Sequence, residues 1–461
     1  MLMSEWGPNI KTDDGPLYLA IANALESDIH SGILKPGEKL PPQRELADRL
    51  GINLSTITRA FRVCELKGVI FGIVGSGTFV ASDVKVPLSL VSQSGSPGII
   101  EMGQVFPLPS MDANTGKIAK TLLQDMDMER LIRYSEPAGN LKHRAIGAEW
   151  LKRFHLNASP DDILITPGSQ NAASICMLTL FEHGDRIAVD ALTYPGIKAL
   201  AAMHGIRLIP IEMTDGGMNP QALLSACRND GIKGIYLMPE VQNPTTLAMT
   251  QDFREQIADI IIKHDLVLIE DDAYGYTGSL DSIPVSAYAP EHGIYIGGTA
   301  KLLGPGFRIS FTRVPNAYIE RMKKGVLNTS WMASPITAEI VAKLIESGKS
   351  EAILKDKRAE AQKRNSIALK KLAPYHVASR PFGFFQWLKL PDGWQGRDFE
   401  MCAREAGVQV FCAEKFAVGS YQLPSAIRIS LSGAETIEEL ERGLDILTGL
   451  LAKGYDNQII I

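Results

Sequence analysis

The stretch IYIGGTAKLLGPGFRISFT, residues 294–312, holds an apolar run, a polar turn and the start of a further strand. Lys301 lies just past the end of the apolar run, four residues before the pair Pro305-Gly306, and Arg308 follows that pair. Pro and Gly favour a tight turn, because Pro fixes its own φ and Gly tolerates positive φ. The stretch therefore predicts a strand end at which one lysine and one arginine lie beside a turn.

Apolar runs of the same kind recur along the chain from about residue 99. They read DILITPG, RIAVDA, RLIPIE, GIYLMP, LVLIEDD and IYIGGT, and amphipathic helical patterns such as NPQALLSACRND lie between them. Strands that alternate with helices predict βαβ units and a mostly parallel sheet. From about residue 331 the runs become sparser and more polar, which indicates a smaller α+β lobe. We therefore expect one domain over residues 99–461, with a large lobe at about 135–330 and a small lobe at about 331–461.

The whole chain has the size and composition of a multidomain globular protein. It has 461 residues, of which 45% are hydrophobic and 21% charged, and this length is about three times that of a usual domain. No uncharged apolar run reaches the roughly 18 residues that a membrane span needs, and the N-terminus lacks the pattern of a secretory signal. The five cysteines are odd in number and scattered, which suggests neither a metal site nor a disulfide framework. We expect a cytoplasmic protein that does not enter a membrane.

The first residues carry the pattern of a helix-turn-helix. An apolar stripe that begins at Leu17 predicts a helix that ends near residue 31, before a glycine. Two further helices, one within ELADRL and one from about residue 54 to 67, are joined by a turn that contains Gly51. Two helices joined by a tight turn with a glycine are typical of this DNA-binding motif.

A predicted hairpin and a linker follow the second of these helices. The segment VIFGIVGSGTFVA alternates between apolar and small residues on both sides of residues 75–77, which predicts a small β-hairpin. Helix-turn-helix and hairpin together make a winged helix, which we expect over residues 1–81. Residues 82–98 are rich in Ser, Gly and Pro and predict a linker.

Polar residues gather where the predicted parallel strands end. The loops read TPGSQ, DALTYPG, PEVQNPTT, EDDAYGY and GGTAKLLGPGFR. Each has an ordinary structural explanation by itself: a helix N-cap at 168–170, a turn at 243–245, a solvated strand end at 271–272 and an exposed loop charge at Lys301. Ligands of such sheets bind at the strand ends, however, so the loops also predict one shared site.

Together the loops fit a phosphorylated aromatic aldehyde. The helix N-terminus at Ser169 and Gln170, with Arg308 beside it, is suited to hold a phosphate. Lys301 can form a Schiff base with an aldehyde. Tyr194 can cover the face of a flat ring, and the carboxylate of Asp271 can keep a ring nitrogen protonated. A lysine and an acidic partner of this kind are typical of pyridoxal phosphate (PLP) sites.

These motifs give the chain a family resemblance. From about residue 100 to 455 it resembles a fold-type I aminotransferase, and its first 80 residues resemble a GntR-type winged helix. The combination resembles the MocR/GabR-like transcriptional regulators. The resemblance implies a multidomain fold, with an N-terminal winged helix-turn-helix and a C-terminal α/β PLP-dependent transferase fold of type I.

The resemblance also assigns the cofactor site. It implies that Lys301, in K-x-x-x-P-G-x-R, is the catalytic and cofactor-binding lysine, and that Asp271 and Tyr274 form the D-x-x-Y pair at the pyridine nitrogen and ring hydroxyl. The implied cofactor-binding residues are Ser169, Gln170, Tyr194, Asn243, Asp271, Tyr274, Lys301 and Arg308. Tyr134, in YSEPAG, is similar to a tyrosine that reaches the phosphate in a neighbouring subunit, which implies a homodimer. Arg428, in IRIS, is similar to the arginine that holds the α-carboxylate of an amino acid.

Some positions of the cofactor site depart from the family pattern. Gly298 stands where the family often has serine or threonine, and Ala300 stands where it often has serine, with Thr299 between them. Thr246, in NPTT, stands where the family usually has a glycine.

The winged helix is expected to contact double-stranded DNA. By resemblance the DNA-binding residues are Arg44, Ser55, Thr56, Thr58, Arg59, Gly75 and Gly77. The alternative is that Ser55 and Thr56 cap a helix and that Arg59 is a solvated charge. Leu54 replaces an arginine that many relatives have, and the wing has Ile73 and Val74 where a basic residue is usual. The chain's formal net charge is −5, and acidic residues outnumber basic ones up to residue 83, so useful DNA affinity is expected to need two modules per dimer.

Two functions are compatible with these motifs. The first is a PLP-binding transcriptional regulator whose aminotransferase-like domain senses PLP, an amino compound, or both. The alternative is a working PLP-dependent aminotransferase with an accessory winged helix, in which Lys301 is also the general base. A scaffold with an inactive cofactor site is a third possibility.

Overall fold

The computed structural model describes most of the chain in several ranges. They are residues 6–8, 16–31, 33–35, 38–66, 69–73, 77–80, 98–124, 126–419 and 423–454. The chain forms two compact units, one with residues 1–90 and 417–423 and one with residues 91–416 and 424–461. The predicted linker lies outside the described residues except for Gly98. None of the helices in the described ranges combines the length and apolar character that a membrane span requires.

The N-terminal unit is a winged helix, as the sequence predicts. Its elements are α1 (Leu17–Ser31), α2 (Gln43–Leu50), α3 (Leu54–Leu66) and the antiparallel strands β1 (Ile70–Ile73) and β2 (Gly77–Val80). Gly51 ends α2 with φ of +64°, a left-handed conformation that costs glycine little, so the chain can turn sharply into α3. Ile21 and Leu25 of α1 pack against Phe61 of α3 in a fully buried core.

The C-terminal unit is built around a seven-stranded sheet. The strand order is β4 (Ile163–Thr166), β12 (Ser310–Arg313), β11 (Gly293–Gly298), β10 (Val267–Asp272), β9 (Gly234–Leu237), β5 (Arg186–Asp190) and β6 (Arg207–Ile211). Strand β12 pairs antiparallel with both neighbours, and the other pairs are parallel. The mostly parallel sheet that the apolar runs predict is confirmed, and the opening stretch forms β11, the turn and β12.

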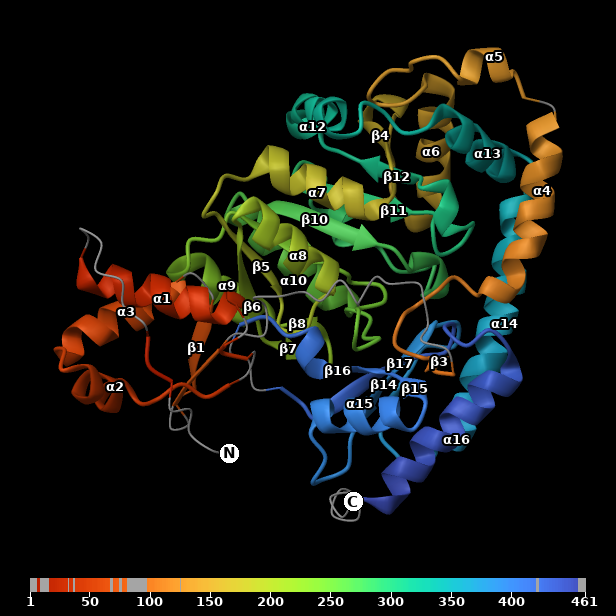
Figure 1. Ribbon diagram of the computed structural model, residues 1–461. Helices are drawn as coiled ribbons and strands as arrows, with labels where there is room; N and C mark the ends of the chain where they lie inside the picture. Colours follow the sequence, from red (N-terminus) through yellow and green to blue (C-terminus); the bar gives the residue numbers. More distant parts are fainter. Residues whose placement is uncertain are drawn as a thin grey trace. The chain divides into compact units, whose positions relative to one another are not determined.

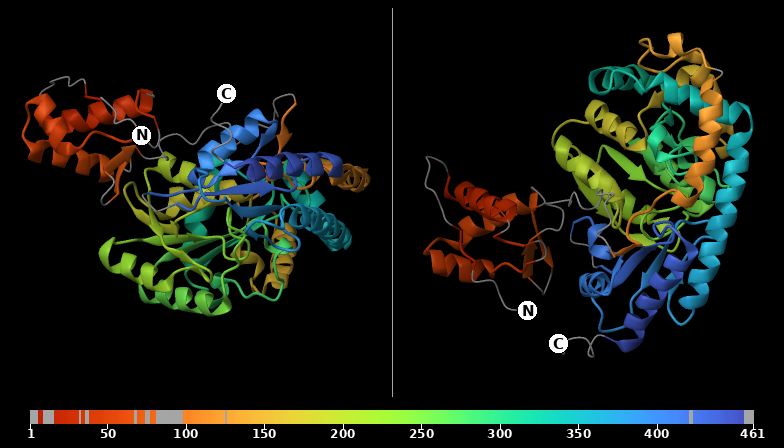
Figure 2. Two further views of the ribbon diagram at one scale, coloured as in Figure 1. Left: turned by 90° about the horizontal axis from the view of Figure 1, so that it is seen from below. Right: turned by 45° about the vertical axis from the view of Figure 1, so that its right-hand side comes forward.

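Helices cover both faces of this sheet (Figures 1 and 2). One face packs against α9 (Pro220–Asn229), α10 (Gln251–Lys263) and α11 (Val285–Tyr288), and the other packs against α7 (Ser169–Leu180). The remaining helices of this part are α4 (Asp112–Gln124), α5 (Met128–Leu131), α6 (Leu141–Leu151), α8 (Pro195–His204), α12 (Asn316–Thr329) and α13 (Pro335–Glu346), and β7 (Met213–Thr214) pairs with β8 (Gly217–Met218). The sheet is buried on both faces, which explains why its strands are almost continuously apolar.

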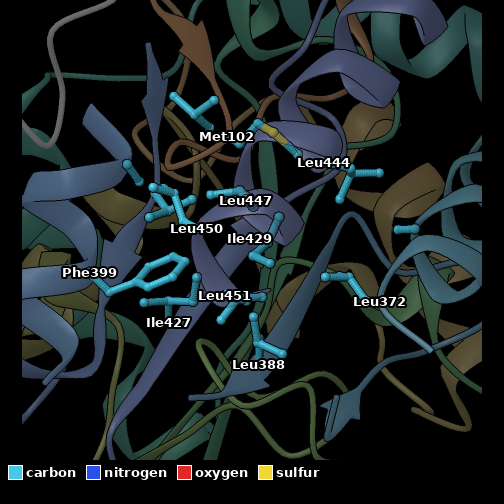
Figure 3. Packing of buried hydrophobic residues seen from close by; sticks show 14 of the residues in the cluster. Met102, Leu372, Leu388, Phe399, Ile427, Ile429, Leu444, Leu447, Leu450 and Leu451 are labelled. Atoms are coloured by element: carbon cyan, nitrogen blue, oxygen red, sulfur yellow. The ribbon is translucent and has the colours of Figure 1, made fainter. Parts of the chain in front are cut away.

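The smaller α+β lobe has an antiparallel sheet and its own core. The strand order is β13 (Val377–Ala378), β14 (Phe385–Lys389), β17 (Ala426–Ser430) and β16 (Phe411–Cys412), with helices α14 (Lys349–Lys371), α15 (Gly396–Glu405) and α16 (Ile437–Lys453). Met102 packs with Phe399, Ile427 and Leu444 in this core (Figure 3). Strand β3 (Ile100–Glu101) pairs with β15 (Val408–Gln409), so the segment that precedes the large sheet is anchored in the small lobe.

Candidate cofactor site

The strand-end loops enclose one cavity of about 210 Å³. Eight of its lining residues are the predicted cofactor-binding residues Ser169, Gln170, Tyr194, Asn243, Asp271, Tyr274, Lys301 and Arg308. They come from loops that are far apart in sequence, and the parallel strands bring these loops to one edge of the sheet. The structure does not place Tyr134 or Arg428 among the residues that line the cavity.

The cavity has donors of the kind that suit an anion. Ser169 is the first residue of α7 and lines the cavity with Gln170, so the N-terminal amides of this helix lie at the cavity. Arg308 lies beside it and donates from Nη2 to the Pro167 carbonyl at 3.1 Å. A Cβ at Gly168, where φ is +82°, would lie 2.5 Å from the Arg308 guanidinium. Because Gly168 has no side chain, the Arg308 guanidinium can lie close to the helix N-terminus.

Gly298 leaves space for the Ser169 hydroxyl. A Cβ at Gly298 would lie 2.5 Å from Ser169 Oγ, so a serine or threonine at 298 would compete with Ser169 for the same volume. Thr299 does not replace the missing hydroxyl, because its buried Oγ1 donates to the Ile309 carbonyl at 2.7 Å and the residue does not line the cavity. The family's usual side chain at position 298 is therefore absent where the Ser169 hydroxyl occupies the same volume.

Asp271, which also lines the cavity, has an unsatisfied carboxylate oxygen. Its Oδ2 accepts from the Tyr236 hydroxyl at 2.8 Å, whereas its buried Oδ1 has no hydrogen-bond partner within the described residues. Burial raises the pKa of this carboxyl to about 6, and the Tyr236 hydrogen bond acts in the opposite direction. A buried acceptor without a partner is costly, and a protonated ring nitrogen would satisfy it. The donor set therefore fits the pyridine ring of PLP.

Tyr236 is a site residue that the sequence did not reveal. It lies within the apolar run GIYLMP, where an aromatic side chain is ordinary core composition. Strand β9 pairs with β10 and sets Tyr236 opposite Ile269, which puts its hydroxyl within reach of Asp271. The only sequence signal is a hydroxyl-bearing residue in an otherwise apolar run, and that signal is weak.

The loop that carries Asn243 is fixed by its neighbours. Asn243 Oδ1 accepts from Arg428 Nη1 at 2.6 Å, and the Gln242 side chain accepts from the amide of Thr245 at 2.9 Å. Thr246 has φ of +64°, so it keeps the left-handed conformation that a glycine usually occupies. Its carbonyl accepts from Arg380 Nε at 2.9 Å. Thr246 therefore keeps the left-handed backbone conformation of a glycine, and the loop follows the same path.

Arg428 is a buried cation beside the cavity. Its Nη2 donates to the Gly103 carbonyl at 2.5 Å, and its Nε is buried without a partner in the described ranges. The rings of Phe385, Phe411 and Phe416 surround the guanidinium, with centroids between 4.8 and 5.6 Å from Cζ. Burial lowers the pKa of Arg428 to about 10. No carboxylate of the described residues forms a salt bridge with it, so it is suited to receive one from a ligand.

Lys301 lies among positive charges. Its Nζ donates to the Val105 carbonyl. Burial lowers the pKa of its ammonium to about 8, and Arg428, followed by Lys357 and Arg308, acts in the same direction. A lowered pKa increases the share of neutral amine at neutral pH, which is the form that attacks an aldehyde.

Tyr134 lies away from the cavity of its own chain. Its side chain is 82% exposed and its ring lies 5.6 Å from that of Trp331. It lines a separate surface pocket with Arg130 and Arg133. The role that the resemblance implies, in a neighbouring subunit, stays a prediction.

The predicted DNA-binding residues lie on the exposed side of the winged helix. Arg44, Ser55, Thr58 and Arg59 are exposed, whereas Ile57 of the same helix is buried. Gly77 is also exposed, Thr56 is half-buried, and Gly75 lies outside the described residues. Exposed polar side chains of this kind are typical of a surface that binds a partner, since they do not contribute to the hydrophobic core.

Two hydroxyls of this surface also have internal partners. Asn53 Oδ1 accepts from both the amide and the hydroxyl of Ser55 at 2.9 Å, so Asn53 caps the start of α3. Thr58 Oγ1 donates to Gln43 Oε1 at 2.9 Å and links α3 to α2. The two hydroxyls therefore also fix the geometry of the helix-turn-helix.

Comparisons with known proteins agree with the geometry of both units. Residues 109–447 match the family described as aminotransferase class I and II, and residues 17–80 match the bacterial regulatory proteins of the gntR family. The HTH-type transcriptional regulator YdeF of Bacillus subtilis (strain 168) is 38% identical over 446 residues, which cover 97% of this chain and 96% of YdeF. The 2-aminoadipate transaminase of Thermus thermophilus is 26% identical over 331 residues, which cover 69% of this chain and 81% of that enzyme.

The solved structures give the same fold for the larger unit. An archaeal alanine:glyoxylate aminotransferase is similar with a TM-score of 0.70 and 25% identity, and the match covers 80% of this chain and 93% of that one. The predicted fold class, a winged helix in front of a fold-type I aminotransferase domain, is confirmed. With its gntR-type DNA-binding unit and its class I and II aminotransferase domain, the chain belongs to the MocR/GabR-like family of transcriptional regulators.

Proposed function

We propose that this regulator binds PLP through Lys301 and uses the cofactor, with or without an amino compound, to control how its winged helix binds double-stranded DNA. The observation that carries the proposal is the unpartnered carboxylate oxygen of Asp271 in the cavity that Lys301 also lines. This arrangement has little structural benefit by itself, because burying an unsatisfied carboxylate is costly. It is explained by a ligand with a protonated ring nitrogen and a group that reacts with an amine.

The residues of the cavity have separate tasks in holding this ligand. Arg308 and the N-terminus of α7 would bind the phosphate, Asp271 the ring nitrogen, and Tyr194 the face of the ring. Asn243 and Tyr274 would contact the ring hydroxyl. When bound, PLP supplies an electron-withdrawing ring that stabilises negative charge at the carbon next to an amino group. Lys301, whose pKa is lowered to about 8, can take up or release a proton there near neutral pH.

Arg428 supports an amino acid or a similar compound as the second ligand. Its guanidinium is buried, positively charged and without a carboxylate partner in the described part of the chain, so a ligand carboxylate would relieve an unfavourable desolvation. The same set of Lys301, Asp271 and Arg428 also favours the second candidate function, a working aminotransferase. Steady turnover of an amino acid and a 2-oxo acid would distinguish that enzyme from a sensor that completes one half-reaction.

We infer that the active form is a cytoplasmic homodimer. Tyr134 and Trp331 form an exposed aromatic pair, and Ile132 and Leu141 nearby in the chain are also largely exposed. Exposed apolar side chains of this size commonly mark an interface. A second copy would cover them, and two winged helices in one particle would raise the effective concentration of each for paired DNA sites.

The absorbance spectrum and DNA binding of the purified protein test the proposal. After incubation with PLP, the wild type is expected to show a visible band that survives dialysis, and Lys301→Ala is expected to lack it. Gel-shift titrations of the upstream DNA of its own gene, with and without PLP, are expected to give different affinities. A wild type without a retained band, or an affinity that PLP leaves unchanged, would contradict the proposal.

A further inference from the structure

Lys357 is a buried cation whose role the proposed function does not explain. It lies on α14, and its side chain is 1% exposed. Its Nζ donates to the Pro107 carbonyl at 2.8 Å, and no carboxylate of the described residues forms a salt bridge with it. Arg364, a second buried cation of α14, has Glu360 as an ion-pair partner. A buried ammonium group without an ion pair is costly, and such groups are frequent at functional sites.

Lys357 and Lys301 hold the same short segment of backbone. The Val105 carbonyl accepts from Lys301 Nζ, and the Pro107 carbonyl accepts from Lys357 Nζ. Lys357 Nζ also lies 3.5 Å from the carbonyl oxygen of Lys301 itself. The ammonium group of Lys357 therefore contacts both the segment of residues 105–107 and the backbone of the lysine in the cavity.

The charges around the two lysines are unequal. Lys301 is faced by Arg428 from β17, by Arg308 from the loop before β12 and by Lys357 from α14, and all three are positive. Lys357 is faced by the acid Asp112 of α4, which opposes the effect of burial on its pKa. Burial lowers the pKa of Lys357 to about 8, so most of it is charged at neutral pH. A positive charge near Lys301 disfavours protonation of the Lys301 amine.

We propose that Lys357 is a positioning residue for Lys301: its buried ammonium group holds the segment of residues 105–107 against the reactive lysine and places a fixed positive charge beside that lysine. The inference rests on the proposed function, in which Lys301 binds PLP. Lys357 touches neither the cavity nor the expected ligand, since it is not among the lining residues, and it acts only through Lys301 and the segment.

Replacement of Lys357 by an uncharged residue of similar length tests this role. Wild type and Lys357→Met are loaded with PLP, and the pH at the midpoint of the change in the visible band is measured. Without the neighbouring charge the Lys301 nitrogen is easier to protonate, so the midpoint is expected to rise by about one pH unit. The rate of PLP attachment at pH 7 is expected to fall about tenfold, because less of the amine is neutral.

Lys355→Met is the matched control. Lys355 lies on the same helix and carries the same charge, but it is exposed, so its replacement is expected to leave both measurements at the wild-type values. Lys357→Arg retains a positive charge and a donor and is expected to restore most of the wild-type midpoint. Lys357→Gln, which removes the charge but keeps a donor, carries the same expectation as Lys357→Met if that variant does not fold.

Three results would overturn the inference. They are a wild-type midpoint in a folded and PLP-loaded Lys357→Met or Lys357→Gln, an equal shift in Lys355→Met, and a Lys357→Arg variant as perturbed as the uncharged ones. A wild type that retains no PLP at all would instead contradict the proposed function. The two failures are thus separable.

Discussion

The cofactor cavity and the exposed face of the winged helix contain similar residue types in opposite surroundings. Asp271, which lines the cavity, and Arg428, which lies beside it, are buried, and each has a polar atom without a partner in the described residues. Arg44 and Arg59 of the winged helix are exposed. Burial changes the pKa of the first pair, and PLP or a substrate carboxylate would compensate for their desolvation. The exposed pair is solvated in the free protein, so it costs the folded state little when no DNA is bound.

The comparison predicts that the buried charges at the cavity lower the stability of the PLP-free protein and favour ligand binding. The exposed charges of the DNA-binding face should have little effect on stability. Removal of the buried charge of Asp271 should change the stability of the PLP-free protein and the affinity for PLP in opposite directions. Substitution of the exposed arginines Arg44 and Arg59 should change DNA affinity alone.

Asp271→Asn is expected to have the largest effect. The carboxyl has a pKa of about 6 in the folded chain and about 3.9 in an unfolded one, so the folded state holds the proton more tightly. Its contribution to stability is present below the unfolded pKa and is lost as pH rises through the folded pKa. At pH 7 the PLP-free variant should therefore be more stable than the wild type, by up to about 3 kcal/mol.

The same substitution should weaken PLP binding, by about 100-fold or more, because it removes the charge that pairs with the ring nitrogen. Urea unfolding of the PLP-free proteins at pH 4 and pH 7, together with PLP titration by absorbance, measures both effects. Asp252→Asn, an exposed carboxylate in the first turn of α10, is the control. A variant that is no more stable at pH 7 than the wild type would show that the buried carboxylate is satisfied in the PLP-free protein.

Arg59→Ala tests the other side of the comparison. If this guanidinium contacts a phosphate, DNA affinity should fall about tenfold for specific and unrelated sequences alike, and the salt slope should decrease by about one. PLP affinity and thermal stability should stay at the wild-type values. Lys35→Ala, which removes an exposed positive charge of the same unit, is the control for net charge. An equal loss in Lys35→Ala would mean that only the overall charge of the unit matters.

The residues that short motifs carry can be placed at the cavity from the sequence, whereas those that only packing brings together cannot. Lys301 and Arg308 were predictable because a strand, a turn and two cations lie within one stretch, and Asp271 because it ends an apolar run. Tyr236 was not predictable, since its hydroxyl meets Asp271 only after β9 and β10 pair. Lys357 lies in a helix whose sequence is rich in lysine, and nothing local distinguishes it from its exposed neighbours.

The fold, too, has parts that the sequence predicts and parts that only packing determines. Alternation of apolar runs and helices predicted the mostly parallel sheet, because each buried strand needs such a run. It did not predict that β3, at Ile100–Glu101, pairs with β15 more than 300 residues later in the chain. A two-residue strand has no periodicity to detect, and its position is fixed by the burial of Met102 in the core of the small lobe.

Gly298→Ser should have the smallest effect on PLP affinity. It is most informative when it is combined with Ser169→Ala. The new side chain would require the volume that Ser169 Oγ occupies, but this hydroxyl is the end of a short side chain that can rotate away. PLP affinity should therefore fall by about fivefold or less, which corresponds to about 1 kcal/mol.

Ser169→Ala alone should lower PLP affinity by a similar amount, because it removes a hydroxyl from the proposed phosphate site. In the double variant, the serine at 298 supplies a hydroxyl to the volume that residue 169 has vacated, so the two losses should not add. PLP titrations of the four proteins measure this coupling, and strictly additive losses would mean that the two positions do not share one hydroxyl site.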